Sequence, residues 1–461
     1  MREYYPLTAA QRMHHIWIND YGTQQVSGVS VVASLRSAID FGLLKKCIQL
    51  EYERSGCMRV RFTKPDANGE VKQYIVARET RDIELADLSG MTMQAADELM
   101  QNWAYQTFDG DNIPMCEVKM VKLPEGYNGF FIHMDHRLID SCGLVVMIND
   151  LMQLYTHYKF GSEYPQDLAD FKETLLNDLA RSGNEKRFAK DKKFWDDQLD
   201  ALGEPLYSDI QGPAVLEASR LRHNDPELRA ADIEMKDLMV YVKDYKLEAE
   251  PTRNLIDFCM NHQLSMTNLL LLGIRTYLSK VNNGQEDITI ENFISRRSTH
   301  AEWTSGGSRT IMFPCRTVIS PDTDFMSAAY EIQNIQNKIY MHSNYDPALI
   351  VEEMRRRYGT PEHTSYESCY LTYQPMPVKM DNPKLANISQ HSKWFANGAA
   401  TKKMYLTVSH TADGGMNFSF HYQRAQLEEH DMELLYYYLM RILFKGIAEP
   451  DMSIGEIMAC I

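Results

Sequence analysis

The stretch Phe130-Phe131-Ile132-His133-Met134-Asp135-His136-Arg137-Leu138-Ile139-Asp140-Ser141 decides how the chain around it folds. Aromatic and β-branched residues from 127 to 132 follow the turn signal at 124–126 and predict a buried strand. From Ser141 onward, apolar residues recur at steps of three and four, which predicts a helix with Ser141 as its N-cap. A polar cluster between strand and helix suits chemistry, because a rigid strand fixes the direction of its last side chains.

The segments around this stretch alternate irregularly between strands and helices. Residues 116–123 are expected to pair with residues 129–134 across the turn between them, and residues 404–410 with residues 417–422 in a second hairpin. Residues 204–232 are expected to be rich in loops. This mixed order predicts an α/β fold of the α+β sandwich type.

The bulk properties limit the class of protein. A chain of 461 residues is expected to form two lobes of about 200 residues each. The net charge of −15 argues against binding to nucleic acid. No apolar run approaches the ~18–20 residues of a membrane span, so no membrane association is expected, and the first residues lack the apolar segment of a signal peptide. The eight cysteines are isolated from one another, which favours a reducing, cytoplasmic compartment.

Residues 135–141 resemble the HHxxxDG signature of nonribosomal peptide synthetase condensation domains and of their acyltransferase relatives. Residues 6–11 are similar to the opening SxAQ helix of that family. Residues 54–62 resemble its RHExLRTxF motif, with both arginines and the phenylalanine retained. Residues 190–195 resemble the helix at the crossing between lobes. The remaining matches, in the family's order, are Arg297, Gly307, Pro314 and Arg316 at the spacing of GRx(9)GxFVNTLPLR, and the strand end Tyr373-Gln374.

The resemblance covers nearly the whole chain and implies a free-standing condensation-type protein. It implies two chloramphenicol acetyltransferase-like lobes in a V-shaped pseudo-dimer with a tunnel between them. Residues 1–180 would carry the signature, and residues 181–461 would supply the floor and latch loops. The implied activity is transfer of an acyl or aminoacyl group from a phosphopantetheine thioester to an amine or alcohol. The donor would be held on an acyl or peptidyl carrier protein or on coenzyme A, with no permanently bound cofactor, and the chain is expected to be a monomer.

The resemblance also implies roles for individual residues. His136 matches the second histidine of the signature, the proposed general base, and an imidazole suits proton removal at neutral pH. Asp140 matches an aspartate that pairs with an arginine and holds the histidine loop in place. Arg297 is the expected partner, with Arg296 as the alternative. Asp135 replaces the first histidine, where its carboxylate would orient His136 or raise its pKa, or would face the other side of the sheet.

Several positions depart from the family pattern. Ser141 replaces a glycine whose backbone N–H is a candidate oxyanion donor, and Gly143 stands where the family often has serine. Arg309 adds a charge to the tunnel floor, where it would select an anionic acyl group or face solvent. Tyr373 and Gln374 would line the acceptor side of the tunnel, or form an ordinary strand end.

Other interpretations of the same residues remain open. His133, Asp135, His136 and Asp140 do not have the spacing of a zinc motif such as HExxH, so no metal is expected. Only proximity supports a nucleophilic role for Cys142. The alternative function is a catalytically inactive docking module for carrier proteins, which the departures in the signature and floor favour. An epimerase or cyclase variant of the fold cannot be separated from these two by sequence.

Overall fold

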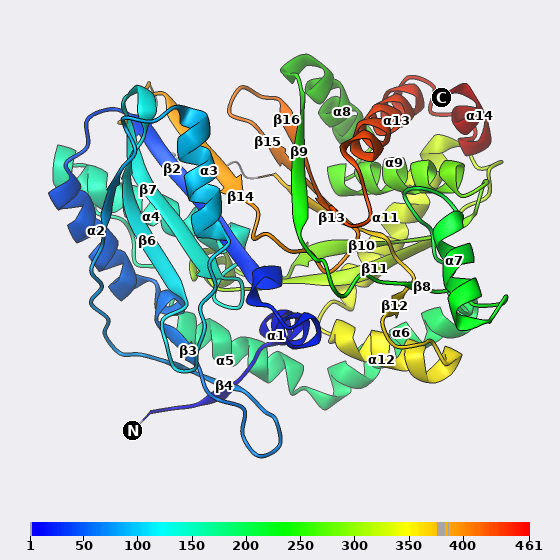
Figure 1. Ribbon diagram of the computed structural model, residues 1–461, viewed down its shortest axis with the longest axis horizontal. Coiled ribbons are helices and arrows are strands. Elements are labelled where there is room, and N and C mark those ends of the chain that lie inside the picture. Colours follow the sequence, from blue (N-terminus) through cyan, green and yellow to red (C-terminus); the bar gives the residue numbers. More distant parts are fainter. Residues whose placement is uncertain (1, 376–382, 386) are drawn as a thin grey trace. The chain divides into compact units, whose positions relative to one another are not determined.

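The computed structural model describes residues 2–375, 383–385 and 387–461. The chain divides into two compact units, each combining helices with β-sheet, so the predicted α/β fold class is confirmed (Figure 1). The first unit comprises residues 1–184, 295–310 and 378–399, and the second comprises residues 185–294, 311–377 and 400–461. The first break in the chain lies near the expected boundary at 180/181. Two later segments return to the first unit, and the contiguous division into lobes stays a prediction.

The first unit is built on a five-stranded sheet in the order β14-β2-β7-β6-β5. Its strands are β14 (Gln390–Phe395), β2 (Gly28–Arg36), β7 (Tyr127–Asp135), β6 (Cys116–Lys122) and β5 (Leu85–Asp87). β7 is antiparallel to both of its neighbours, β2 and β6. The predicted pairing of residues 116–123 with 129–134 is therefore confirmed. A smaller sheet contains β1 (Tyr5–Pro6), β4 (Lys72–Ile75) and β3 (Val60–Phe62).

Helices cover both faces of the five-stranded sheet, so β7 is buried on both sides (Figure 1). Phe130 and Ile132 pack into the core formed with α2 and α4, whereas Phe131 packs into the core formed with α3. This alternation follows from the two-residue period of a strand. The helices of this unit are α1 (Ala9–Tyr21), α2 (Phe41–Arg54), α3 (Met93–Ala104), α4 (Ser141–Phe160), α5 (Phe171–Ser182) and α10 (His300–Thr304).

The second unit is built on a six-stranded sheet in the order β11-β10-β13-β15-β16-β9. Its strands are β11 (Thr310–Val318), β10 (Asp287–Ser295), β13 (Cys369–Gln374), β15 (Met404–His410), β16 (Met416–Gln423) and β9 (Val240–Leu247). β15 and β16 are antiparallel, so the second predicted hairpin is confirmed. A two-stranded sheet pairs β12 (Thr364–Ser365) with β8 (Ala231–Asp232).

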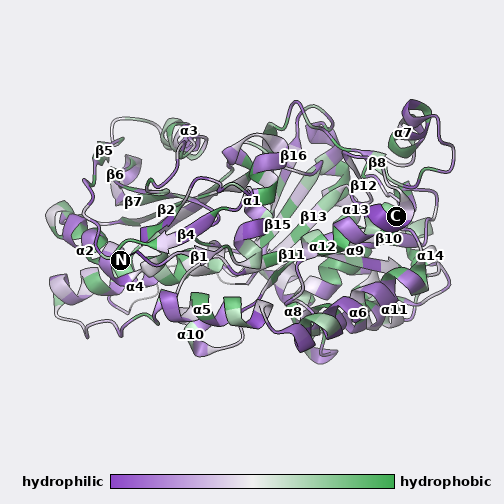
Figure 2. Cartoon of the chain, turned by 90° about the horizontal axis from the view of Figure 1, so that it is seen from below, coloured by the Kyte–Doolittle hydropathy of each residue, from purple (hydrophilic) through white to green (hydrophobic). Residues whose placement is uncertain are grey.

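The helices of the second unit show alternating hydrophilic and hydrophobic bands, most clearly along α6 and α11 (Figure 2). They are α6 (Glu185–Leu202), α7 (Ala214–His223), α8 (Ala249–Asn261), α9 (Met266–Val281), α11 (Phe325–Met341), α12 (Pro347–Tyr358), α13 (Glu429–Ala448) and α14 (Ile454–Cys460). The expectation of a loop-rich segment at 204–232 is wrong where α7 forms. Only Leu216 and Ser219 of α7 are buried, so its apolar pattern is too weak to read. Within the described ranges, no helix is long and apolar enough to cross a bilayer.

Candidate active site

The loop that follows β7 is held by the backbone and by buried side chains. The His136 backbone N–H donates to the carbonyl of Ser27 at 2.7 Å. Leu138 and Ile139 are fully buried, and Asp140 begins the next helix as its N-cap. A loop anchored at each of these points presents the His136 ring in one fixed direction.

His136 is partly exposed, and its ring stacks on the ring of His14 from helix α1. The two ring centroids are 4.3 Å apart, with an angle of 21° between the planes. Nδ1 of His136 and both ring nitrogens of His14 are buried and have no hydrogen-bond partner among the described residues. Nε2 of His136 is therefore the ring nitrogen through which this pair meets solvent.

Both imidazoles favour the neutral form. Burial is the main cause that lowers the pKa of His136, while Asp140, the residue's own backbone and Asp135 oppose that shift more weakly. The pKa of His14 lies well below its ordinary value, because burial disfavours a proton there, and so do the Arg137 charge and any proton on His136. At neutral pH the His136 ring is thus a free base.

Asp140 is the centre of a buried network that fixes the helix start. Nη1 and Nη2 of Arg297 each donate to its carboxylate at 2.7 Å, and both side chains are about 1% exposed. The backbone N–H groups of Arg309 and Thr310 donate to the same carboxylate at 2.9 and 3.0 Å. Burial alone would raise the pKa of Asp140, but Arg297 and the backbone N–H groups of Gly143 and Arg309 hold it well below the usual range. The pair joins residues 295–310 to the His136 loop within one compact unit.

The N-cap of α4 is Asp140 and not Ser141, which corrects the sequence-based expectation. Asp140 accepts a hydrogen bond from the Gly143 backbone N–H at 2.9 Å, and Ser141 is the first residue of the helix. The Gly143 N–H is therefore engaged in capping and is not a free oxyanion donor. A Cβ at Gly143 would lie 2.7 Å from the Ile139 side chain and 3.0 Å from the carbonyl of Gly307, so only glycine fits.

Asp135 faces Arg137 and not the His136 ring. Its carboxylate accepts from Nε of Arg137 at 2.9 Å and from Nη2 at 2.8 Å. The Arg137 backbone N–H donates to it at 2.8 Å and the Gln24 side chain at 3.0 Å. The Asp135 side chain has no exposed surface. These contacts hold the turn after β7, and they leave Asp135 only the weak electrostatic effect on His136 described above. The catalytic role expected for Asp135 thus has no direct contact behind it.

Arg309 is buried, so the expectation that it faces solvent is wrong. Its guanidinium lies 2.9 Å from the Asp178 carboxylate, which balances its charge. Arg296, the alternative partner for Asp140, lies 3.7 Å from the same Asp178. Selection of an anionic acyl group by Arg309 stays a prediction, and it would require Arg309 to leave Asp178.

His133, within the stretch 130–141, and Cys142, directly after it, have settled structural environments. Nδ1 of His133 lies 2.8 Å from Ser30 Oγ, and its Nε2 lies 2.9 Å from the carbonyl of Gln106. Cys142 is partly buried, and burial next to Asp140 raises the pKa of its thiol. A thiol held in its protonated form is a poor nucleophile, so the geometry gives no support to a nucleophilic Cys142. Among the residues that the structure describes, no three His, Cys, Asp or Glu side chains form a group suited to a metal ion.

The comparison with known families agrees with this arrangement over the full length of the chain. The family model described as "Condensation domain" matches residues 1–460. The chain belongs to the condensation-domain family. Condensation domains are acyltransferases that form amide bonds.

Relatives of this condensation domain are much longer proteins. Surfactin synthase subunit 1 of Bacillus subtilis (strain 168) is 22% identical over 469 residues, which cover 98% of this chain and 12% of that protein. Tyrocidine synthase 2 of Brevibacillus parabrevis is 19% identical over 458 residues, which cover 98% of this chain and 12% of that protein. The chain thus spans only a small part of the length of these curated relatives.

Solved structures share the fold. The first condensation domain of the calcium-dependent antibiotic synthetase, in complex with a substrate analogue, has a TM-score of 0.80 at 15% identity, covering 99% of this chain and 98% of that one. The starter condensation domain of rhizomide synthetase, in complex with C8-CoA, has a TM-score of 0.80 at 16% identity, covering 98% and 96%.

The predicted acceptor-side residues of the condensation domain lie in the second unit. Tyr373 and Gln374 end strand β13. Tyr373 Oη lies 2.7 Å from Nε2 of His410 at the end of β15, and burial raises the pKa of Tyr373 to about 12. The hydrogen bond to His410 satisfies the Tyr373 hydroxyl, as is usual for polar groups removed from water. The place of these residues beside an acceptor stays a prediction.

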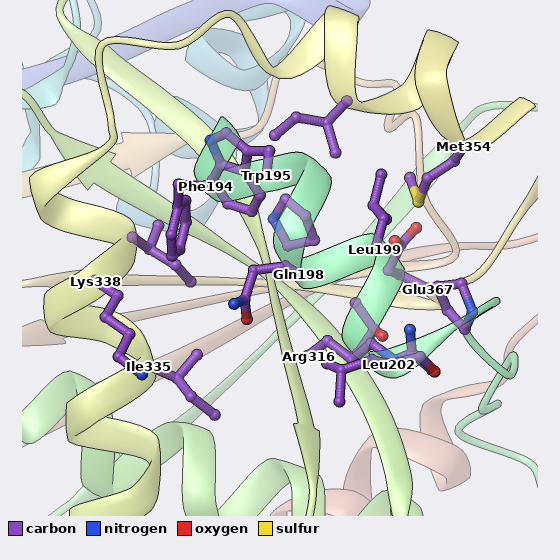
Figure 3. Close-up of a pocket in the computed structure, with 15 residues that line it drawn as sticks. Phe194, Trp195, Gln198, Leu199, Leu202, Arg316, Ile335, Lys338, Met354 and Glu367 are labelled. Carbon is purple, nitrogen blue, oxygen red and sulfur yellow. The ribbon is translucent and has the colours of Figure 1, made fainter. Parts of the chain in front are cut away.

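The second unit also contains an apolar pocket that sequence reasoning missed. Figure 3 shows Phe194, Trp195 and Leu199 of α6 on one side of this pocket, with side chains of α11 on the other. The polar lining residue Arg316 is already paired with Asp287, with two contacts of 2.7 Å. The pocket is therefore mainly apolar, and the charge of Arg316 is already balanced by Asp287.

His14 is the residue near the base that sequence reasoning missed. It lies four residues after the buried Ala10, and this spacing places both on one face of α1. The helical spacing from Ala10 was the one signal that the His14 imidazole would enter the core. The sequence held no sign that this imidazole would meet His136.

Proposed function

We propose that this condensation domain transfers an acyl or aminoacyl group from a phosphopantetheine thioester to an amine or alcohol, forming an amide or ester in natural-product biosynthesis. The proposal is supported chiefly by the protonation state and the position of the His136 ring. It favours the neutral form, it is partly exposed, and its Nδ1 is buried without a partner in the described chain, which leaves Nε2 for an outside group. It also stands on an anchored loop that matches the family signature. A base with these properties removes a proton at neutral pH without first having to lose one.

In this reaction His136 acts first as the general base and then as the general acid. Nε2 of His136 accepts the proton of the amine or alcohol as that nucleophile attacks the thioester carbonyl. The tetrahedral intermediate then collapses, the carbon–sulfur bond breaks, and the imidazolium returns its proton to the departing thiolate. Asp140 and Arg297 touch no reacting atom in this scheme; they hold the loop that aims His136. The backbone N–H of Ser141, at the positive end of α4, is the proposed oxyanion donor.

The donor is proposed to be a carrier-bound or coenzyme A thioester, and the partner an acyl or peptidyl carrier protein. Two findings on relatives support this. The rhizomide starter domain was solved in complex with C8-CoA, and the curated relatives include synthases of surfactin and tyrocidine. We propose a monomer in the cytoplasm, in keeping with the two-lobed pseudo-dimeric fold that the resemblance implies.

The test is mass spectrometry of products formed from a panel of thioesters with mixed amines and alcohols. Each donor is supplied in coenzyme A, pantetheine and carrier-protein form, to wild type, His136→Ala and the matched control His133→Leu. Acyl product from wild type and the control, but not from His136→Ala, supports the proposal. Background product from all three with every donor form favours a docking module instead. Equal product above background from all three contradicts the role of His136.

A further inference from the structure

Helix α1 places an imidazole against the inner face of the proposed base. His14 is 3% exposed and lies between two rings. Its stack on His136 is nearly parallel, and Trp17 meets its ring edge-on at 5.1 Å and 84°. A ring enclosed in this way has one orientation, because rotation would drive it into either neighbour.

The His14 nitrogens make no hydrogen bond within the described chain, so hydrogen bonding does not explain its presence. The ring is also uncharged at neutral pH, since burial and the adjacent His136 and Arg137 oppose a proton and lower its pKa. The negative charge of Asp140 raises the pKa of His14, but more weakly than these effects lower it. On the same helix, the charges that act on His15 are those of Arg137 and Asp135. What remains for His14 to contribute is a flat, neutral aromatic face.

We propose that His14 is a positioning residue for His136: its ring packs flat against the base and fixes the plane in which His136 presents Nε2. The inference rests on the proposed function, because it assigns the stacked ring a part in the same proton transfer. The packing shields the inner face of His136 from water.

Two substitutions distinguish the effect of the flat His14 ring from the effect of its two nitrogens. His14→Ala removes the ring and opens the inner face of His136 to water. His14→Phe keeps a flat ring and removes both nitrogens. His15→Ala is the matched control, because His15 is the neighbouring imidazole and its Nε2 lies 3.1 Å from the Asn19 side-chain amide, away from His136.

Two readouts are measured for each variant after circular dichroism has established that it is folded. The first is the NMR titration of the His136 ring in the substrate-free protein. The second is kcat and KM for acyl transfer as a function of pH. In His14→Ala we expect the His136 titration to move up toward the ordinary value of ~6.5 and kcat to fall about tenfold, with KM changed less than about twofold. His14→Phe is expected to restore the wild-type titration and kcat to within about threefold, and His15→Ala to match wild type.

Three results would overturn the inference. One is a wild-type titration and kcat in His14→Ala. Another is a His14→Phe variant as impaired as His14→Ala, which would mean that the nitrogens matter. The third is an effect of His15→Ala equal to that of His14→Ala. If wild type transfers no acyl group from any donor, the proposed function fails, while the ring titration still decides whether His14 controls His136.

Discussion

Two histidines three residues apart, His133 and His136, show opposite uses of the same side chain. Both ring nitrogens of His133 have partners, Ser30 and the Gln106 carbonyl, and Phe108 stacks on its ring at 4.7 Å. Because the Gln106 carbonyl only accepts, Nε2 of His133 must carry the proton, and one tautomer is fixed. Nδ1 of His136 has no partner in the described chain. The hydrogen bonds of His133 hold the fold together, whereas His136 keeps Nε2 for a group from outside.

The largest expected effect comes from removing the free histidine. His136→Ala is expected to lower kcat by about 10²- to 10⁴-fold, because proton removal from the nucleophile loses its catalyst. The free energy of unfolding should change little, since the side chain makes no hydrogen bond that the fold would lose. Steady-state kinetics, with the donor identified by mass spectrometry, measures kcat, and urea unfolding measures the free energy of unfolding. A variant that is unfolded, or that retains wild-type kcat, would break the contrast with His133.

The next effect concerns the anchor of the His136 loop. Asp140→Asn leaves Arg297 buried without the carboxylate it pairs with, and we expect the free energy of unfolding to fall by about 3–5 kcal/mol. The double variant Asp140→Asn/Arg297→Met should recover part of this loss, because it removes the stranded charge. Urea unfolding of the three proteins measures the coupling. A single-variant loss below about 1 kcal/mol would show that the pair does not hold the loop.

Substitution of His133 is expected to lower stability and leave activity unchanged, the reverse of the result expected for His136. His133→Leu leaves the Ser30 hydroxyl and the Gln106 carbonyl without their partner, at an expected cost of about 1–3 kcal/mol in unfolding free energy. Activity per folded molecule should stay within about twofold of wild type. A loss of kcat comparable to that of His136→Ala would place both histidines in the reaction and remove the distinction between them.

The smallest effect is on the pH dependence of stability. The folded-state pKa values of His14, His133 and His136 are all lowered, with burial as the main cause. Below about pH 6.5 the unfolded chain binds protons that the folded chain does not, so stability is full above that pH and falls as pH drops toward the folded-state values. Urea midpoints at pH 7 and pH 5.5 should therefore differ less for His14→Phe than for wild type. An equal difference would mean that His14 is not buried in its neutral form.

The local pattern of the sequence predicted the elements that carry the site, and long-range contacts decided the rest. Alternation and helical spacing suffice for β7 and α4. Ser141 and Asp140 are both good N-caps, and in the structure the cap is Asp140, whose carboxylate also pairs with Arg297, a residue distant in sequence. β14 has a largely polar sequence and pairs with β2 from the far end of the chain, so no local signal announces it. The contact between His14 and His136 likewise joins residues far apart in sequence, and no local pattern predicts it.

The most direct test of the central claim, that His136 is the base, is the pH dependence of kcat/KM set beside the NMR titration of the His136 ring in the free protein. For the free enzyme, kcat/KM reports the groups whose protonation state controls the reaction. We expect the acidic limb of the wild-type profile to coincide with the ring titration, at a pKa below the ordinary value of ~6.5. Any residual activity of His136→Ala should lack this limb. A limb that does not follow the ring titration, or one that persists in His136→Ala, would contradict the claim that His136 is the base.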